Sequence, residues 1–368
     1  MPHLYVHVPF CRRRCVYCDF AIAVRRTIPG ERFVDAILRE AALRGTPEPD
    51  VESATLYFGG GTPSLLAPHQ LARLIDAFAP APRAEVTLEA NPDDVTGENA
   101  RGWANAGINR VSLGVQSFDD GVLRWMHRTH TAADARNAVA TARDAGIENV
   151  SLDLIFGLPA ALGCDWERDV EMALECAPDH VSVYGLTVEA RTPLRRWVER
   201  GSIPAVDEGR YEREYLLAHE ELEAAGFDHY EISNYARPDR RAVHNGVYWS
   251  GAPYVGLGPS AHSFDGETRR WNVRDWARYE TIVCGDADPV ENAEHLTPAQ
   301  QRLERVLLGL RTVAGVEAAS SGSFPSWLRE AVAAGWVQAH DGSLRLTPVG
   351  WLRIDELLPR LTTFLEGG

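Results

Sequence analysis

The sequence contains no lysine, so all 37 of its basic residues are arginine. With 52 acidic residues the formal net charge is −15, and an acidic surface disfavours nucleic acid and anionic lipid, which are bound through basic patches. No apolar run is long enough to span a membrane, and the first residues do not resemble a secretion signal. We therefore expect a cytoplasmic protein without a membrane span, although peripheral membrane contact stays open.

Cysteine is scarce as well, with six residues in 368. Disulfide frameworks are unusual in large proteins of reducing compartments, so we expect free thiols. Cys164, Cys176 and Cys284 are scattered, and we interpret them as small buried apolar side chains. The other three lie within eight residues, in the stretch HVPFCRRRCVYCDF that runs from His7 to Phe20.

The first half of the chain alternates between two kinds of segment. Short runs rich in β-branched and aromatic residues predict strands, and amphipathic segments between them predict helices. Repeated strand–helix units predict a parallel sheet with right-handed crossovers. The pattern alone leaves open whether this sheet is open or curved into a barrel. The predicted strands begin at Leu4, Thr55, Glu85, Arg110, Asn149 and His180.

After about residue 190 this alternation ends. A helix is predicted over 208–225, and segments rich in aromatic and turn residues follow it. Near the C-terminus two predicted helices precede a hairpin with Asp341-Gly342 at its turn, an order that resembles a winged helix. The acidic net charge favours a docking or lid module here over a DNA-binding one. We expect three parts, at 1–190, 191–296 and 297–368.

Polar and glycine residues stand where five of the predicted strands end. Because the carboxyl ends of parallel strands share one edge of a sheet, we expect these residues to form a single site. They are the cysteine loop, the triplet 59–61, Glu89 with Asn91, Gln116 and Asp153.

The spacing of Cys11, Cys15 and Cys18 allows three thiolates on one loop to meet at a metal centre. Cys15 and Cys18 could also form a redox pair, His7 could complete a zinc site, or the spacing could be coincidence. A closed zinc site normally draws ligands from a second segment, and no second cysteine pair exists. An iron–sulfur cluster with three cysteine ligands would leave one iron open to a chelating small molecule. The three arginines inside the loop would favour thiolates.

The pattern C-x-x-x-C-x-x-C after the first strand resembles the signature of radical S-adenosylmethionine (SAM) enzymes. The resemblance implies a 4Fe–4S cluster on Cys11, Cys15 and Cys18, with SAM bound at the open iron by its amino and carboxylate groups. GGGTP at residues 59–63 resembles the glycine motif of these enzymes, whose backbone binds the SAM amino group. Glycine suits that task because it permits close backbone approach.

Five ordered motifs narrow the resemblance: LYVHVPFC, GGGTPSLL, LEANP, NRVSLGVQSF and LDLIFGLP. They resemble the group that contains the HemN-like oxygen-independent coproporphyrinogen III oxidase and the haem chaperone HemW. This implies an α/β fold, a six-stranded partial (β/α) radical SAM barrel with a C-terminal extension and a small winged-helix-like module. The motifs also carry the oxidase's SAM contacts onto this chain, while the binding of a second SAM stays open. The matched positions are Tyr5, Tyr17, Gly60, Gly61, Thr62 and Glu89 for one SAM, and Gln116, Arg128 and Asp153 for a second.

Departures from the oxidase pattern bear on function. Phe20 stands where the oxidase has a fourth cysteine, and only ten residues precede Cys11, where the oxidase carries an extension. Both differences argue against coproporphyrinogen decarboxylation, and the letters CDF match HemW. HNGVYW at 244–249 resembles the HemW-type HN-x-x-YW segment. Because histidine can ligate haem iron, His244 is the first candidate for that role and His262 the second.

We therefore predict a haem chaperone that binds a 4Fe–4S cluster, SAM and, as cargo, haem, which it passes to haem-requiring proteins. One alternative is the oxidase, which converts coproporphyrinogen III to protoporphyrinogen IX. The other is a radical SAM enzyme with a different substrate. No catalytic residue is assigned.

Overall fold

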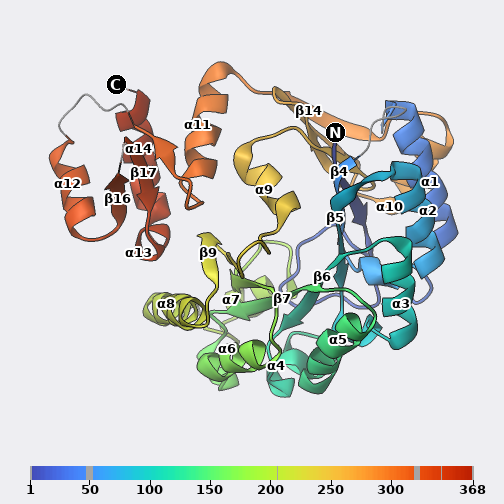
Figure 1. Ribbon diagram of the computed structural model, residues 1–368, viewed down its shortest axis with the longest axis horizontal. Helices are drawn as coiled ribbons and strands as arrows, with labels where there is room; N and C mark the ends of the chain where they lie inside the picture. The colour runs from blue at the N-terminus through green and yellow to red at the C-terminus, as the bar shows by residue number, and fades with distance from the viewer. Residues whose placement is uncertain (1, 47–52, 205, 319–323, 341, 367–368) are drawn as a thin grey trace.

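The computed structural model describes residues 2–46, 53–204, 206–318, 324–340 and 342–366 (Figure 1). Its centre is a nine-stranded sheet with the order β11-β1-β4-β5-β6-β7-β8-β10-β9. The six middle strands are parallel and follow chain order, as predicted. They are β1 (His3–Val8), β4 (Ser53–Gly60), β5 (Pro80–Ala90), β6 (Arg110–Gln116), β7 (Asn149–Phe156) and β8 (His180–Gly185).

Strands from the second part of the chain extend both edges of this sheet. The strand β11 (Val255–Leu257) pairs in parallel with β1, and β10 (Asn234–Ala236) pairs antiparallel with β8 and with β9 (Asp228–Glu231). Among the described residues β11 and β9 do not pair with each other, so the barrel stays partial. The sequence did not predict these strands, because three or four residues carry too little periodicity.

Helices pack around the outside of the sheet (Figure 1). Most begin where the sequence places an Asp or Thr whose side chain accepts an amide hydrogen bond of the first turn, for example Thr96, Asp119 and Thr131. Gly45 ends α1 in the left-handed conformation. These helices are α1 (Gly30–Arg44), α2 (Pro68–Phe78), α3 (Gly97–Ala106), α4 (Asp120–Trp125), α5 (Ala132–Asp144), α6 (Trp166–Glu175) and α8 (Glu208–Ala224).

Short elements connect and flank the barrel. A second sheet is antiparallel, in the order β12-β13-β14. The cysteine loop starts on β2, which pairs with β3. These elements are β2 (Phe10–Cys11), β3 (Ala23–Val24), α7 (Pro193–Glu199), α9 (Val243–Ser250), β12 (His262–Phe264), β13 (Thr268–Asn272), α10 (Trp276–Cys284) and β14 (Val290–His295), with 3₁₀ turns at Pro63–Leu65, Pro92–Asp94 and Ala160–Leu162.

The C-terminal part lies beside the barrel, near β9 (Figure 1). The amide of Ile232 donates to the Arg311 carbonyl at 2.9 Å, and the ring of Trp351 stands edge-on to His229. The predicted hairpin is present as β16 paired with β17; of its turn residues, Asp341 lies outside the described residues. The elements are α11 (Pro298–Gly309), β15 (Val316–Glu317), α12 (Ser326–Ala333), β16 (Val337–His340), β17 (Ser343–Leu346), α13 (Pro348–Trp351) and α14 (Ile354–Glu366).

Two further expectations concern membranes and cysteine. Among the described helices, none is both long and apolar enough to cross a membrane. All six cysteines are free thiols, but the expected burial of the scattered three was wrong. Cys164 and Cys176 are only partly buried and Cys284 is exposed, because Cys164 precedes α6, Cys176 caps its C-terminus and Cys284 ends α10.

Trp103 on α3 offers a test of the packing between helices and sheet. Its side chain is fully buried, and its indole N–H has no partner among the described residues. We expect Trp103→Ala to lower the free energy of unfolding by about 3–5 kcal/mol. Trp103→Phe should cost clearly less, because it leaves a smaller cavity and no hydrogen bond is lost. Urea denaturation of both variants measures this, and equal losses would contradict the packing described.

Candidate functional site

A cavity of about 350 Å³ opens at the carboxyl ends of the parallel strands. The residues predicted to meet there do meet: Cys11, Cys15 and Cys18 line the cavity together with residues from the ends of five strands. Of the motif-matched SAM residues, only Tyr5 does not line it. The ring of Tyr5 does not reach the cavity and is stacked on the ring of Tyr57. The matched residues that line the cavity are Tyr17, Gly60, Gly61, Thr62, Glu89, Gln116, Arg128 and Asp153.

The cysteine loop is held in place from several sides. Thr62 donates its hydroxyl to the Cys11 sulfur at 3.4 Å, and Arg128 Nη1 lies 3.6 Å from the Cys15 sulfur. The amide of Val16 donates to the Met126 carbonyl at 3.3 Å. The segment after α4 therefore supports the loop between its cysteines.

The arginines of the loop have separate partners. Arg12 Nη1 lies 2.6 Å from Asp94 Oδ1, and Arg14 donates to the Cys18 carbonyl at 3.3 Å. Arg13 is exposed and also lines the cavity. Two of the three arginines thus stabilise the loop, while all three keep positive charge beside the thiols.

Burial raises the pKa of the Cys11 thiol, and it raises the pKa of Cys18 to about 11. These two side chains are therefore protonated at neutral pH when no metal is present. Metal binding to thiolates releases such protons, so the affinity of the site for metal rises with pH.

The surroundings of His7 bear on the zinc alternative. His7 Nε2 lies 3.1 Å from the Ala21 carbonyl, which can only accept, so Nδ1 accepts from the Tyr5 hydroxyl at 3.1 Å. Both nitrogens of His7 are thus engaged. Within the described ranges, no three His, Cys, Asp or Glu side chains are arranged around a single ion. Three thiols that line one cavity from a single loop are the kind of donor set that holds an iron–sulfur cluster.

The glycine turn packs directly against the cysteine-bearing strand. The Gly61 amide donates to the Val8 carbonyl at 2.8 Å, and a Cβ at Gly61 would lie only 2.8 Å from the Phe10 carbonyl oxygen. Gly60 has a φ of 108°, and a Cβ there would approach the His7 ring to 2.6 Å. Larger residues would push the two loops apart.

Two carboxyl groups face the cavity without a direct arginine partner. Glu89 accepts hydrogen bonds from the Tyr57 hydroxyl at 2.8 Å and the Gly60 amide at 3.0 Å. Burial nevertheless raises the pKa of Glu89 to about 7. Asp153 accepts from Ser112 at 3.1 Å, and burial raises its pKa too. The site can thus gain negative charge when a cationic ligand arrives.

Strained backbone also marks this site. Gln116 (φ 71°) and His127 (φ 63°) adopt the left-handed conformation without being glycine, and both line the cavity. Such residues cluster at functional sites. The turn at His127 aims Arg128, whose Nη2 donates to Asn91 Oδ1 and to the Gly114 carbonyl, each at 2.7 Å. Arg128 therefore joins the ends of two strands to the cysteine loop.

Among the lining residues that the sequence analysis did not single out are Ser112, Tyr184 and Glu189. Tyr184 lies near the carboxyl end of a predicted strand, so the rule that found Glu89 and Asn91 could have found it. Ser112 is inside β6, and Glu189 follows β8 in a loop with no distinctive motif. Their placement depends on the fold.

The two haem candidates occupy different environments. His244 on α9 is 1% exposed, and its ring nitrogens lie 2.7 Å from the Thr55 hydroxyl and 2.9 Å from the Tyr248 hydroxyl. His262 at the start of β12 is exposed. Neither lines the cavity, so the described structure does not join the haem candidates to the cysteine site.

Comparison with known proteins gives consistent results. Residues 5–173 match the Radical SAM superfamily. The chain is 39% identical over 366 residues to the haem chaperone HemW of Mycobacterium tuberculosis, which covers 97% of this chain and 94% of that protein. It is 33% identical to HemW of Bacillus subtilis, over 97% of this chain and 98% of that protein. The coproporphyrinogen III oxidase HemN of Escherichia coli shares the fold, with a TM-score of 0.82 at 22% identity over 99% of this chain and 90% of that chain.

The raised pKa of Glu89 predicts a pH-dependent stability. The folded, cofactor-free chain keeps this proton up to about pH 7, whereas the unfolded chain loses it near the ordinary value of 4.5. The contribution of protonated Glu89 to the free energy of unfolding is therefore fully present below about pH 4.5 and is lost as the pH rises through about 7. Between these two pH values, the free energy of unfolding of the wild type should fall by about 1–3 kcal/mol relative to that of Glu89→Gln.

Urea denaturation of the cofactor-free protein on both sides of this window measures the difference. Glu220→Gln, at an exposed position on α8, serves as the matched control and should show no comparable change. A free-energy difference between wild type and Glu89→Gln that stays constant with pH would contradict the raised pKa.

Proposed function

We propose that this chain, which belongs to the HemW haem chaperone family within the radical SAM superfamily, binds haem and passes it to haem-requiring proteins. One observation carries the proposal: the similarity to two HemW proteins extends over 97% of the chain. It includes the second half, which the superfamily match to residues 5–173 does not reach. Similarity to the oxidase at 22% identity concerns the fold only.

The proposed resident cofactors are a 4Fe–4S cluster and SAM. Cys11, Cys15 and Cys18 would hold the cluster, and the glycine turn with Glu89 would hold the amino end of SAM. A bound cluster would supply one-electron reduction of SAM; the protein positions both groups and excludes water. Support comes from the three thiols that line one cavity and from the match of residues 5–173 to the Radical SAM superfamily.

The protein's own groups act on this site by charge and hydrogen bonding. Thr62 and Arg128 donate toward cysteine sulfurs, and such donors tune the reduction potential of iron–sulfur centres. Glu89 could accept a hydrogen bond from the SAM amino group, and the positive charge of the SAM sulfonium would favour its carboxylate form. The contacts of Gln116, Arg128 and Asp153 to a second SAM are part of the same proposal.

Phe20 separates the proposed chaperone from the oxidase. It stands at the position of the oxidase's fourth cysteine, lines the cavity and is 58% exposed. An exposed aromatic side chain at the mouth of a site fits contact with a planar apolar molecule or a partner protein. The proposal also keeps the cytoplasm as the compartment, because six free thiols suit reducing conditions.

The ligand role of the cysteine loop predicts the outcome of Cys15→Ser. Anaerobic reconstitution of this variant should give iron and sulfide near background and no brown cluster absorption, because one of three ligands is lost. Cys284→Ser, at an exposed cysteine far along the chain, is the control and should reconstitute fully. Full iron and sulfide in Cys15→Ser would exclude the proposed ligand set.

The chaperone assignment predicts no oxidase activity. The reconstituted chain, given coproporphyrinogen III, SAM and a reductant, should release no CO₂ above background, while the Escherichia coli oxidase assayed in parallel should. Haem should instead bind saturably to the same preparation. SAM-dependent CO₂ release by this chain would overturn the chaperone proposal in favour of the oxidase.

A further inference from the structure

The structure separates the two histidines that could ligate haem. Both ring nitrogens of His244 are hydrogen-bonded, and its ring is packed between aromatic side chains, with centroids 5.0 Å from Tyr57 and 5.2 Å from Tyr248. A haem iron could reach His244 only if α9 moved and these contacts broke. Burial also lowers the pKa of His244 to about 3, as expected for a packed neutral ring.

His262 is accessible by contrast. It is exposed, and within the described residues its ring nitrogens have no hydrogen-bond partner. It lies directly across from Trp271 in the β12–β13 pair, and the two rings stack with centroids 5.7 Å apart at 24°. Cross-strand partners share one face of a sheet. Trp271 therefore packs against one face of the imidazole and fixes the plane of the ring whose nitrogen would bind iron.

The pKa of His262 is lowered by partial burial and by the Arg269 cation. Its imidazole is therefore neutral at neutral pH, which is the form that binds iron. Arg269 belongs to the same face as His262 and Trp271, because it precedes Trp271 by two residues on β13. Its guanidinium is itself held by Glu304 at 2.9 Å.

The loop that carries His262 is strained. Ser260 has a φ of 62° without being glycine, and Gly258 has a φ of 100°, where a Cβ would lie 2.6 Å from the His7 carbonyl oxygen. Hydrogen bonds fix both sides of the loop: Ser260 N to the Val273 carbonyl at 3.0 Å, and Asn272 N to the Ala261 carbonyl at 3.0 Å. Strain of this kind persists only where the surroundings impose it.

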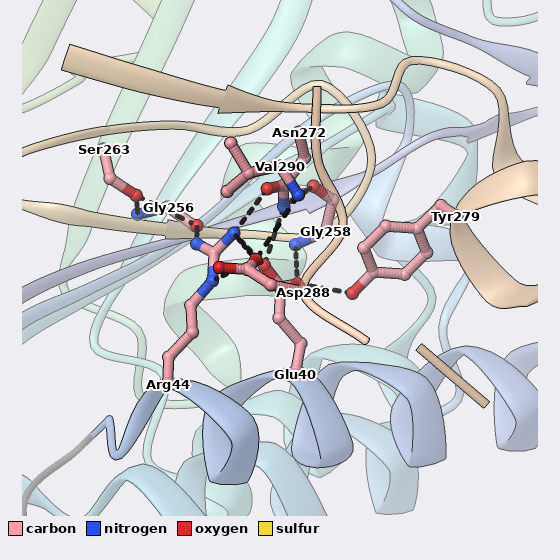
Figure 2. A network of polar contacts seen from close by, with 9 residues as sticks. All are labelled: Glu40, Arg44, Gly256, Gly258, Ser263, Asn272, Tyr279, Asp288 and Val290. Carbon is pink, nitrogen blue, oxygen red and sulfur yellow. Dashed lines mark hydrogen bonds and ion pairs between the residues drawn. The ribbon is translucent and has the colours of Figure 1, made fainter. Parts of the chain in front are cut away.

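A buried network of charged and polar side chains holds this strained loop in place (Figure 2). Glu40 of α1 is fully buried and accepts hydrogen bonds from Gly258 N and Asn272 Nδ2, each at 2.7 Å, and from the Tyr279 hydroxyl. Arg44, one turn later, pairs with Glu40 at 3.1 Å and donates to the Gly256 carbonyl at 3.2 Å. The network is therefore hydrogen-bonded both to the loop before His262 and to the strand that carries Trp271.

Such a network contributes little net stability to the fold. Desolvating two charges offsets most of their attraction, so a buried ion pair is weak evidence for a contribution to stability. What Glu40 and Arg44 do contribute is geometry: they fix a strained loop and its neighbouring strand to a rigid helix. Binding sites depend on such support behind the residues that touch the ligand.

The same segment also reaches the cysteine loop. Arg274, two residues beyond Asn272, donates to the carbonyl of Asp19, the neighbour of exposed Phe20. The segment after β13 thus contacts the cysteine loop through the Arg274 side chain, one residue before Phe20, which lines the cavity. Haem bound on the His262 face would lie on the part of the extension that contacts the cysteine loop.

We propose that His262 supplies the iron ligand for haem, that Trp271, stacked on the imidazole, fixes the orientation of that ring, and that the Glu40–Arg44 network positions both. This inference rests on the proposed haem-carrying function and adds the residue, the face and its support.

Haem titration of the full-length, anaerobically reconstituted protein tests the ligand, with Soret absorption and electron paramagnetic resonance of ferric haem as readouts. His262→Ala should lower haem affinity at least tenfold and change the ligand-field spectrum, while His244→Ala should keep the wild-type spectrum. His295→Ala, at an exposed histidine on neighbouring β14, controls for adventitious surface ligation and should also keep it. Added imidazole should restore the wild-type spectrum to His262→Gly.

The outcomes distinguish this inference from the proposed function. Loss of the spectrum in His244→Ala but not in His262→Ala would overturn the inference and leave haem carriage intact. An unchanged spectrum in all three variants would overturn it as well. Absence of saturable haem binding by the wild type would overturn the proposed function, and the inference with it.

Glu40→Gln tests the positioning role. It keeps the shape of the side chain and removes its charge, so the network loosens. Well below its unfolding temperature, this variant should bind haem with broadened resonance lines and a lower affinity, while His262 remains the ligand. A variant that is less stable but has an unchanged haem spectrum would show that the network only stabilises the fold.

Discussion

The contact between the glycine turn and the end of β1 is the constraint on which the rest of the site depends. The Gly61 amide reaches the Val8 carbonyl at 2.8 Å, and only hydrogen fits in place of a side chain at that point. This approach brings Thr62 to the Cys11 sulfur and Gly60 to the carboxylate of Glu89. The cysteine loop, the glycine backbone and Glu89 thus share one wall, because two loops can pack without side chains between them.

The same crowding explains the electrostatics of the cavity. Groups that line it lie at strand ends, where water is largely excluded, so burial is the largest cause of the raised pKa at Glu89, Asp153 and Cys18. These acids and thiols, whose pKa values are raised, line the same cavity as the Arg128 cation. A site prepared in this way can release protons as cationic or metallic ligands bind. Binding and proton release are then coupled in one small volume.

Much of this could be predicted from sequence, and the reasons for the rest are physical. The six parallel strands follow from short buried runs, and the convergence of Cys11, Glu89, Gln116 and Asp153 follows from the rule that parallel strands end at one edge. Three features could not be predicted from the sequence, because they join residues far apart in the chain. They are the edge strands, the burial of His244 and the hydrogen bond from the Gly258 amide to Glu40. Glu40 and Asn272, for example, are separated by 232 positions. No local pattern predicts such a pair.

The central claim is that the chain carries haem and gives it up to another protein, and transfer is its most direct test. Haem-loaded protein is mixed with the apo form of a haem-requiring protein, and the Soret band is followed over time. The account predicts that the acceptor gains its own haem spectrum as this chain loses one, faster than from the same concentration of free haem in a control. Haem that stays with the chain, or transfer no faster than from free haem, would contradict it.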